Sequence, residues 1–213
     1  MVRQTFLIVV TMIVCSCSHL EVNGLFVSSN EGVQSRFKQN VEMNPGLKAG
    51  VLSAQESYLC DVLADVDTPK VYLSGNSNFL STAGDAMYQA DMIRLAGGCN
   101  VAAEIADTYW AEIDYEQLLA WDPDYIILAS SAKYTVDDVL ADPNLADCAA
   151  VVNGNVYQIP ADAESWDSPV PGSILGALWL ANVLHSEQLT DADCTAIMDE
   201  YYETFYHFTY SKN

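Results

Sequence analysis

The sequence predicts an α/β fold in which helices flank a small, mostly parallel sheet. Three short segments rich in β-branched and aromatic residues alternate with longer segments of helical periodicity, an order typical of parallel sheets. The clearest strand spans residues 125–129, an unbroken apolar run that suits a strand covered on both faces. Asp122 and Pro123 end the helix before it, because proline cannot continue a helix. The other two predicted strands span residues 70–74 and 156–159.

Apolar residues at helical spacing, with start and stop signals, predict the helices between and after these strands. Ser53 followed by Glu56 forms a capping-box pattern, and Thr135 caps a short helix with Asp138 behind it. The compact domain is therefore expected to span residues 53–213. The predicted helices cover residues 53–66, 85–95, 112–121, 135–140, 172–185 and 191–205, with a turn or short helix at 146–151.

The composition excludes several classes of protein. Hydrophobic residues make up 51% of the chain, which argues against general disorder. With 29 acidic and 8 basic residues, the formal net charge is -21, whereas binding a nucleic-acid backbone requires clustered Lys and Arg. We therefore expect no nucleic-acid partner, and we interpret the acidity as a solvated surface.

The first residues have the pattern of an export signal. Arg3 precedes an apolar run at residues 6–14 and then small residues, a run too short to span a bilayer. Residues 14–17, Val-Cys-Ser-Cys, resemble the lipobox of bacterial lipoproteins, so residues 1–17 would be the signal peptide and Cys17 the lipid anchor. An ordinary secretory signal or an uncleaved anchor is the alternative. The protein is thus expected on the outer face of the cell membrane or in the periplasm, with residues 18–52 poorly structured.

Four further cysteines lie in the predicted domain. In an oxidising compartment they could pair, with three possible connectivities, or remain as buried free thiols. They show no CxxC spacing and have few histidines near them, so a structural zinc site is not predicted. These residues are Cys60, Cys99, Cys148 and Cys194.

The motifs of common enzyme classes are missing. The chain has no GxGxxG after its first strand and no P-loop, GxSxG, HExxH or SxxK pattern. Within the predicted domain, residues 53–213, the only histidines are His185, at the end of an apolar helix, and His207, in an aromatic tail, where packing explains both. We therefore predict that the protein is not an enzyme.

Small polar residues follow the predicted strands. Asn76 comes after the strand at 70–74, and Ser130, Ser131 and Lys133 come after the strand at 125–129. Because ligands of parallel sheets gather at the carboxyl ends of the strands, we expect these side chains to face a ligand.

Aromatic residues in loops complete the predicted site. Tyr109 and Trp110 precede the helix at 112–121, and Trp166 lies after the third strand between charged neighbours, which predicts its exposure. Trp121 and Trp179 fall on helix faces and are expected to pack in the core. Loop aromatics suit a bulky, partly apolar ligand.

Several blocks of sequence together resemble a known family. They are LSTAGDAMYQADMIRLAGGCNVAAE, EIDYEQLLAWDPDYIILAS, NGNVYQIP and SWDSPVPGSILGALWLANVLH. In combination they are similar to the C-terminal lobe of periplasmic-binding-protein-like solute receptors, specifically those that serve ABC importers of ferric siderophores, haem and cobalamin. The resemblance covers residues 53–210.

The resemblance implies a receptor with two α/β lobes joined by a long helix, whose end would be residues 53–66. A metal chelate or corrinoid would bind between the lobes, and an ABC permease and ATPase would be partners, with Glu164 a candidate permease contact. The receptor would need no cofactor of its own. Such receptors carry an N-terminal lobe before the helix, and the few residues between Cys17 and the helix suggest that most of it is lacking here.

The basic residues and histidines narrow the expected ligand. Arg94 and Lys133 are the only basic residues between Lys70 and Lys212, which suits a strongly anionic catecholate chelate poorly. The scarcity of histidine disfavours bare zinc or manganese, so haem or a corrinoid is preferred. The alternative hypothesis is a surface-anchored lipoprotein that binds a protein partner and no small molecule.

Overall fold

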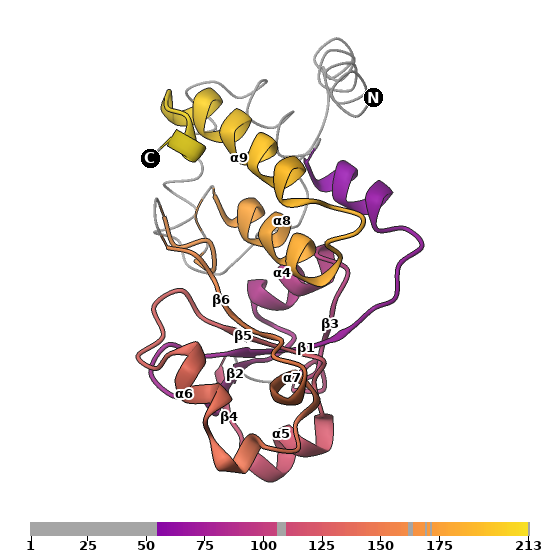
Figure 1. Ribbon diagram of the computed structural model, residues 1–213, viewed down its shortest axis with the longest axis vertical. Coiled ribbons are helices and arrows are strands. Elements are labelled where there is room, and N and C mark those ends of the chain that lie inside the picture. The colour runs from indigo at the N-terminus through magenta and orange to yellow at the C-terminus, as the bar shows by residue number, and fades with distance from the viewer. Residues whose placement is uncertain (1–54, 106–109, 162–163, 169, 171, 213) are drawn as a thin grey trace.

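A computed structural model describes residues 55–105, 110–161, 164–168, 170 and 172–212. These residues form three layers, with a sheet between two groups of helices (Figure 1). The strands are β1 (Lys70–Ser74), β2 (Ser81–Ala83), β3 (Cys99–Asn100), β4 (Trp110–Glu112), β5 (Tyr125–Leu128) and β6 (Val156–Gln158). The helices are α4 (Tyr88–Leu95), α5 (Tyr115–Trp121), α6 (Val136–Leu140), α7 (Ala149–Val152), α8 (Ser173–Leu184) and α9 (Asp191–Tyr206), with short 3-10 turns at Pro143–Leu145 and Tyr210–Lys212.

The sheet has a parallel centre and an antiparallel side. Its order is β4-β2-β1-β5-β6, and β3 pairs with the beginning of β1. The strands β3, β1, β5 and β6 are parallel, whereas β2 and β4 are added antiparallel. The predicted α/β class with a small, mostly parallel sheet is therefore confirmed. The sequence missed β2, β3 and β4, which are too short to show a periodic pattern. The equally short β6 was predicted because turn residues at 153–155 and Pro160 mark its ends.

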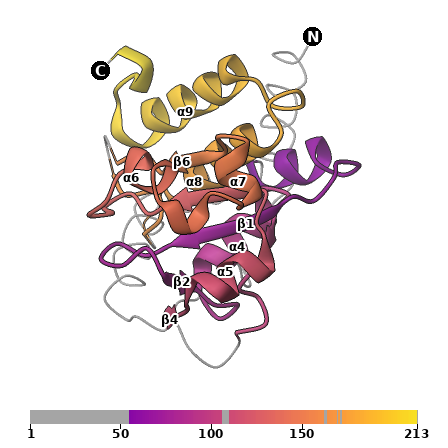
Figure 2. The same ribbon diagram turned by 60° about the horizontal axis from the view of Figure 1, so that its bottom comes forward.

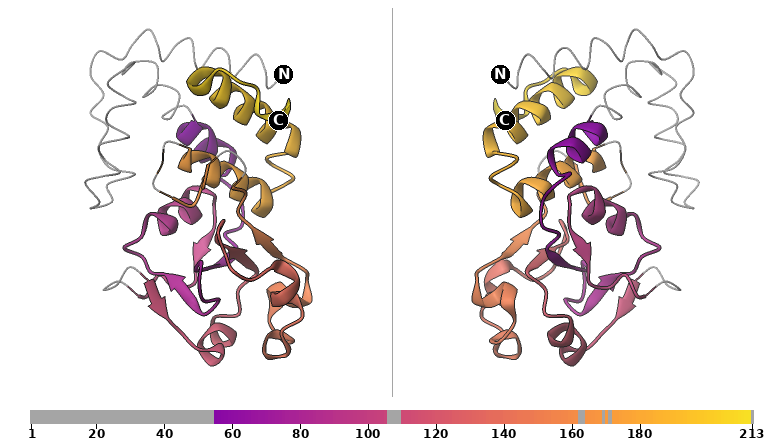
Figure 3. Two further views of the ribbon diagram at one scale, coloured as in Figure 1. Left: turned by 90° about the vertical axis from the view of Figure 1, so that its left-hand side faces the viewer. Right: turned by 90° about the vertical axis from the view of Figure 1, so that its right-hand side faces the viewer.

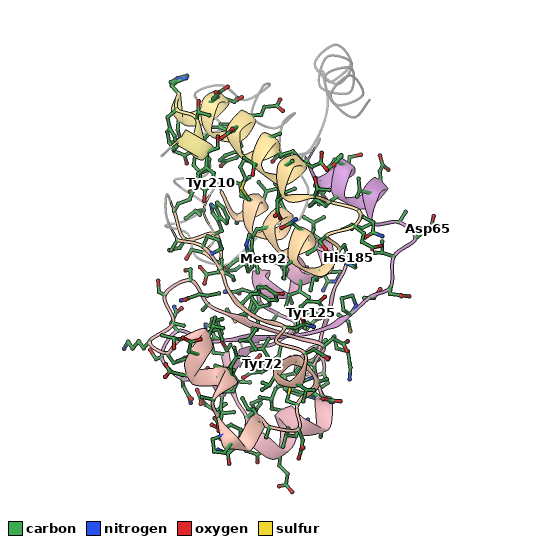
Figure 4. All side chains as sticks on the ribbon, viewed as in Figure 1. Asp65, Tyr72, Met92, Tyr125, His185 and Tyr210 are labelled. Atoms are coloured by element: carbon green, nitrogen blue, oxygen red, sulfur yellow. The ribbon has the colours of Figure 1, made fainter. Side chains whose placement is uncertain are left out.

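Alternating side chains of the central strands supply two separate cores. In β1, Val71 and Leu73 join the core under α4, α8 and α9, whereas Tyr72 enters the core beside α5 and α7. Figure 4 shows Tyr72 on one side of the sheet and Tyr125 with Met92 on the other. Coverage of both faces explains why these strands are continuously apolar.

A helical segment at residues 55–62 precedes the sheet and packs on the larger core through Leu59. Figure 3 shows it beside α8 and α9. The helix ends at Val62, four residues before the predicted end, and Ser53 lies outside the described residues.

Two other helices begin later than predicted. Glu112 belongs to β4, and α5 begins at Tyr115 because the Asp114 side chain accepts a hydrogen bond from the Gln117 N–H. Similarly, α4 begins at Tyr88. The predicted cap of α6 is confirmed as a full capping box between Thr135 and Asp138.

All four cysteines of the described residues are free thiols. Cys148 and Cys194 are buried, but Cys60 and Cys99 are exposed, so the expected burial holds for only two of them. Among the described helices, none is long and apolar enough to cross a membrane. The predicted signal peptide and Cys17 lie outside the described residues.

Candidate functional site

The carboxyl ends of β1 and β5 meet at one edge of the sheet. The Lys133 backbone N–H donates to the Asn76 carbonyl at 2.9 Å, which joins the loops that follow the two strands. The Tyr134 hydroxyl also donates to the Gly75 carbonyl. The structure therefore brings together four of the predicted site residues. We call this the carboxyl edge, formed by Asn76, Ser130, Ser131 and Lys133. In Figure 2, the loop after β1 lies at the left, near α6.

Asp167 contacts this edge and was missed as a site residue by sequence reasoning. Its carboxylate accepts two hydrogen bonds from Ser130, one from the backbone N–H at 2.7 Å and one from the hydroxyl at 2.6 Å. Only 8% of Asp167 is exposed. The two residues are 37 positions apart, so no local sequence pattern could have indicated the contact.

Trp166 is buried, and its predicted exposure is wrong. Only 2% of the residue is exposed, its indole N–H donates to the Tyr202 hydroxyl at 3.1 Å, and its ring lies against Tyr210. The acidic neighbours Glu164 and Asp167 suggested a solvated loop, but both carboxylates accept hydrogen bonds from the protein. Acidic neighbours in the sequence therefore do not keep Trp166 in solvent, because their carboxylates are hydrogen-bonded within the protein.

Trp110 lies away from the carboxyl edge. It pairs with Ala83, whereas Glu112, at the other end of β4, pairs with Ser81 next to the loop that follows β1. The Asn78 amide accordingly donates to Glu112. Trp110 is 39% exposed on an outer strand, so the structure does not bring it to the carboxyl edge. Its predicted neighbour Tyr109 lies outside the described residues.

Trp121 and Trp179, predicted to pack in the core, are partly buried against the two clusters. Trp121 also donates its indole N–H to Glu104 at 2.9 Å. His185 caps the end of α8 and is buried, with its Nε2 atom 3.3 Å from the Gly97 carbonyl. It is labelled in Figure 4. These residues serve packing, as the sequence predicts.

The Glu164 carboxylate lies over the beginning of α8. It accepts hydrogen bonds from the Gly172 backbone and from the Tyr202 hydroxyl, the latter at 3.4 Å. A Cβ atom at Gly172 would lie 2.0 Å from a Glu164 carboxylate oxygen. Burial raises the pKa of Glu164, and the two hydrogen bonds oppose that effect. The predicted permease contact of Glu164 stays a prediction.

A Glu164→Gln variant is expected to change the pH dependence of stability. Because the folded-state pKa of Glu164 is raised, its favourable contribution is complete below the ordinary carboxyl pKa and is lost as the pH rises through the folded-state value. Gln keeps a hydrogen-bond acceptor but carries no charge, so the variant does not lose stability in this way. Its free energy of unfolding, relative to that of the natural protein, should therefore be higher at pH 7 than at pH 4, on the two sides of the ordinary carboxyl pKa. Urea unfolding at both pH values measures this difference, and a constant difference would contradict it.

Lys133 is the basic side chain of the carboxyl edge. Lys70 donates to the Trp121 carbonyl at the opposite end of the strands. Arg94 pairs with Asp91 on α4 and with Asp85, which precedes α4. Lys133 is exposed. A solute at the edge would therefore meet an ammonium group together with hydroxyl and amide groups.

This arrangement is suited to reversible binding. Hydroxyl, amide and ammonium groups donate hydrogen bonds to a polar solute. Within the residues that the structure describes, no group of three or more His, Cys, Asp or Glu could hold a metal ion.

Comparison with known proteins agrees with the fold. Residues 64–163 match the family model described as periplasmic binding protein. The molybdate-binding protein MolA of Haemophilus influenzae is 30% identical over 159 residues, which are 74% of this chain and 45% of that protein. A solved structure of this Haemophilus protein bound to molybdate covers 89% of this chain and 60% of its own, with a TM-score of 0.70 and 26% identity.

A second solved structure, Helicobacter pylori CeuE with Ni(II) bound, is similar in fold alone. Its TM-score is 0.73 at 20% identity, covering 85% of this chain and 60% of that one. The three-layer fold and the matched segment are similar to one α/β lobe of these proteins. The resemblance stated from the sequence is confirmed, and over the matched residues the chain is similar to periplasmic binding proteins. It spans less than half the length of its curated relative.

Proposed function

We propose that this protein is an extracytoplasmic solute-binding protein of an ABC importer and that the carboxyl edge contacts the solute. The observation that carries the proposal is the junction of β1 and β5, where the 2.9 Å hydrogen bond between Lys133 and Asn76 brings four polar residues together. Ligands of parallel α/β sheets bind at such edges. The partners would be the permease and ATPase of the importer.

The proposal includes the predicted organisation of the chain. The helix that ends at Val62 would be the end of a bridging helix, and the remainder to residue 213 would be the C-terminal lobe. A signal peptide at residues 1–17 would direct export, and Cys17 would carry the lipid that attaches the protein to the outer face of the membrane.

For the solute, we propose a small oxyanion such as molybdate. The sequence-based preference for haem or a corrinoid rested on aromatic residues, but Trp166 is buried and Trp110 is away from the edge. Among the described residues, the predicted contacts that remain at the edge are Lys133 and the hydroxyl and amide groups beside it, which suit an oxyanion. The 30% identical relative is a molybdate-binding protein, which supports this choice. A ferric chelate, haem or a corrinoid is the second candidate, supported by the family resemblance.

Isothermal titration of the full chain with sodium molybdate, hemin, cyanocobalamin and a ferric hydroxamate tests the proposal. We expect molybdate to bind, and Lys133→Ala to weaken its binding about tenfold or more, since hydrogen bonds to charged groups contribute about 1.5–3 kcal/mol. Lys70→Ala is the matched control, because Lys70 lies at the opposite end of β1 and donates to Trp121.

Binding of hemin or the hydroxamate in place of molybdate would support the second candidate. If none of the four solutes binds, the receptor proposal fails for this chain. The alternative of a surface lipoprotein that binds a protein partner would then be preferred.

A further inference from the structure

We propose that Asp167 is a positioning residue which holds the carboxyl edge in its binding shape by fixing Ser130. In this arrangement Ser130 does not donate a hydrogen bond to the solute. The neighbouring residues Ser131, Lys133 and Asn76 contact the solute instead. We call the Ser130–Asp167 contact the latch. The role of the latch in binding rests on the proposed function, whereas its role in ordering the edge does not.

The latch uses both hydrogen-bond donors of Ser130. The backbone N–H reaches one carboxylate oxygen of Asp167 at 2.7 Å, and the hydroxyl reaches the other at 2.6 Å. Both distances are in the range of charge-assisted hydrogen bonds. A serine has only these two donors, so a solute oxygen would have to displace the carboxylate to accept a hydrogen bond from Ser130.

These two hydrogen bonds compensate the burial of the Asp167 carboxylate. The residue is 8% exposed, and a buried carboxylate is costly unless it is paired or hydrogen-bonded. Among the described residues, the ion pairs between side chains involve Arg94 with Asp85 and Asp91, not Asp167. Ser130 therefore supplies the compensation, which makes the contact costly to break.

The segment that carries Asp167 is itself firmly held. Trp166 is buried and hydrogen-bonded to Tyr202, and the Asp167 carbonyl accepts a hydrogen bond from the Gln89 amide at 3.3 Å. A Cβ atom at Gly176 would lie 2.7 Å from the Trp166 carbonyl, which shows how closely α8 approaches this segment. The latch thus connects the end of β5 to a support built from α4, α8 and α9.

The held residue lies next to the groups that would bind the solute. Ser130 directly precedes Ser131, and three residues later Lys133 is tied to Asn76 by its backbone. The Gln158 amide lies 3.4 Å from the Ser130 carbonyl. Fixing Ser130 therefore limits the positions open to Ser131 and Lys133, and binding sites depend on such supporting contacts for their geometry.

Amide hydrogen exchange of the full chain without any ligand tests the latch. In Asp167→Asn, we expect exchange at residues 130–133 and 164–168 to be about tenfold faster or more, because a charged partner of two donors is removed. The control is Asp193→Asn. Asp193 likewise accepts from a hydroxyl and a backbone N–H, those of Thr190, but at the start of α9. It should leave exchange at residues 130–133 unchanged.

Ser130→Ala is the second variant, needed if Asp167→Asn does not fold. It removes the hydroxyl and keeps the N–H, so a smaller increase in exchange is expected at the same two segments. Unchanged exchange at both segments in the variants that fold would overturn the latch.

Titration with sodium molybdate separates a positioning role from direct contact. We expect Ser130→Ala to weaken binding in step with its faster exchange, and Ser131→Ala to weaken binding without any change in exchange at residues 164–168. Weaker binding of Ser130→Ala with exchange like that of the natural protein would overturn the proposal, because Ser130 would then be a direct donor. If the natural protein binds no solute, the proposed function fails, and the exchange data still decide the latch.

Discussion

Replacing Trp166 by alanine is expected to lower the free energy of unfolding by about 3–5 kcal/mol, the usual cost of removing a large aromatic side chain from a core. The indole is 2% exposed and packs beside Tyr210, and its N–H donates to the Tyr202 hydroxyl. Alanine would leave a cavity and remove the donor to Tyr202. Urea unfolding followed by far-UV circular dichroism measures the change.

Trp110→Ala is the control for this prediction. Trp110 is 39% exposed on the outer strand β4, so its removal should cost clearly less than removal of Trp166. Equal losses in the two variants would contradict the assignment of Trp166 to the core. A normal stability of Trp166→Ala combined with lost solute binding would restore the sequence-based view of an exposed ligand contact.

Replacing Gly97 by alanine is expected to destabilise the protein by about 2–5 kcal/mol, from backbone strain and overpacking together. Gly97 has a φ of 76°, in the left-handed region that disfavours a side chain. A Cβ atom there would lie 2.8 Å from the buried His185 ring, whose Nε2 atom already contacts the Gly97 carbonyl. The glycine therefore lets the end of α4 approach the end of α8.

Gly154→Ala separates the two contributions. Gly154 has a φ of 72°, close to that of Gly97, but nothing lies within 4 Å of a Cβ atom placed there. Its replacement should cost about 1–2 kcal/mol from backbone strain alone. The difference between the two variants in thermal or urea unfolding then measures the contact with His185. Equal effects would show that this contact adds nothing.

The structure changes the solute that we propose. Sequence reasoning placed aromatic rings around the ligand and therefore favoured haem or a corrinoid. With Trp166 in the core and Trp110 distant from the edge, the described groups at the edge are polar, and Lys133 supplies a positive charge. The proposal of an oxyanion follows from this change as much as from the molybdate-binding relative.

Local patterns predicted what depends on local chemistry. The capping box of Thr135 and Asp138 joins residues three positions apart, and the stop at Pro123 acts on its immediate neighbours. The strand at residues 125–128 was recognisable because burial on both faces leaves a continuous apolar run. In contrast, β2, β3 and β4 are too short for a pattern, and pairing with β1 or with each other stabilises them.

The grouping of polar residues at the carboxyl edge was also predicted from the sequence. Asn76, Ser130, Ser131 and Lys133 were found because parallel strands bring their carboxyl ends together. Asp167 was overlooked and Trp166 misplaced, because each depends on a partner 36 or 37 residues away. A charged residue next to a tryptophan in the sequence predicts that the tryptophan is exposed to solvent, unless the residue that pairs with the charge is known.

The sequence by itself determined the α/β class and the strand ends that gather the polar edge, since these follow from periodicity, turn residues and strand direction. Blocks of sequence also carried the resemblance to periplasmic binding proteins. Only the tertiary structure decided which of the remaining residues reach that edge. Burial of Trp166 and the contact of Asp167 with Ser130 depend on how α8 and α9 pack over the sheet. Such packing joins residues far apart in the chain, and no local preference encodes it.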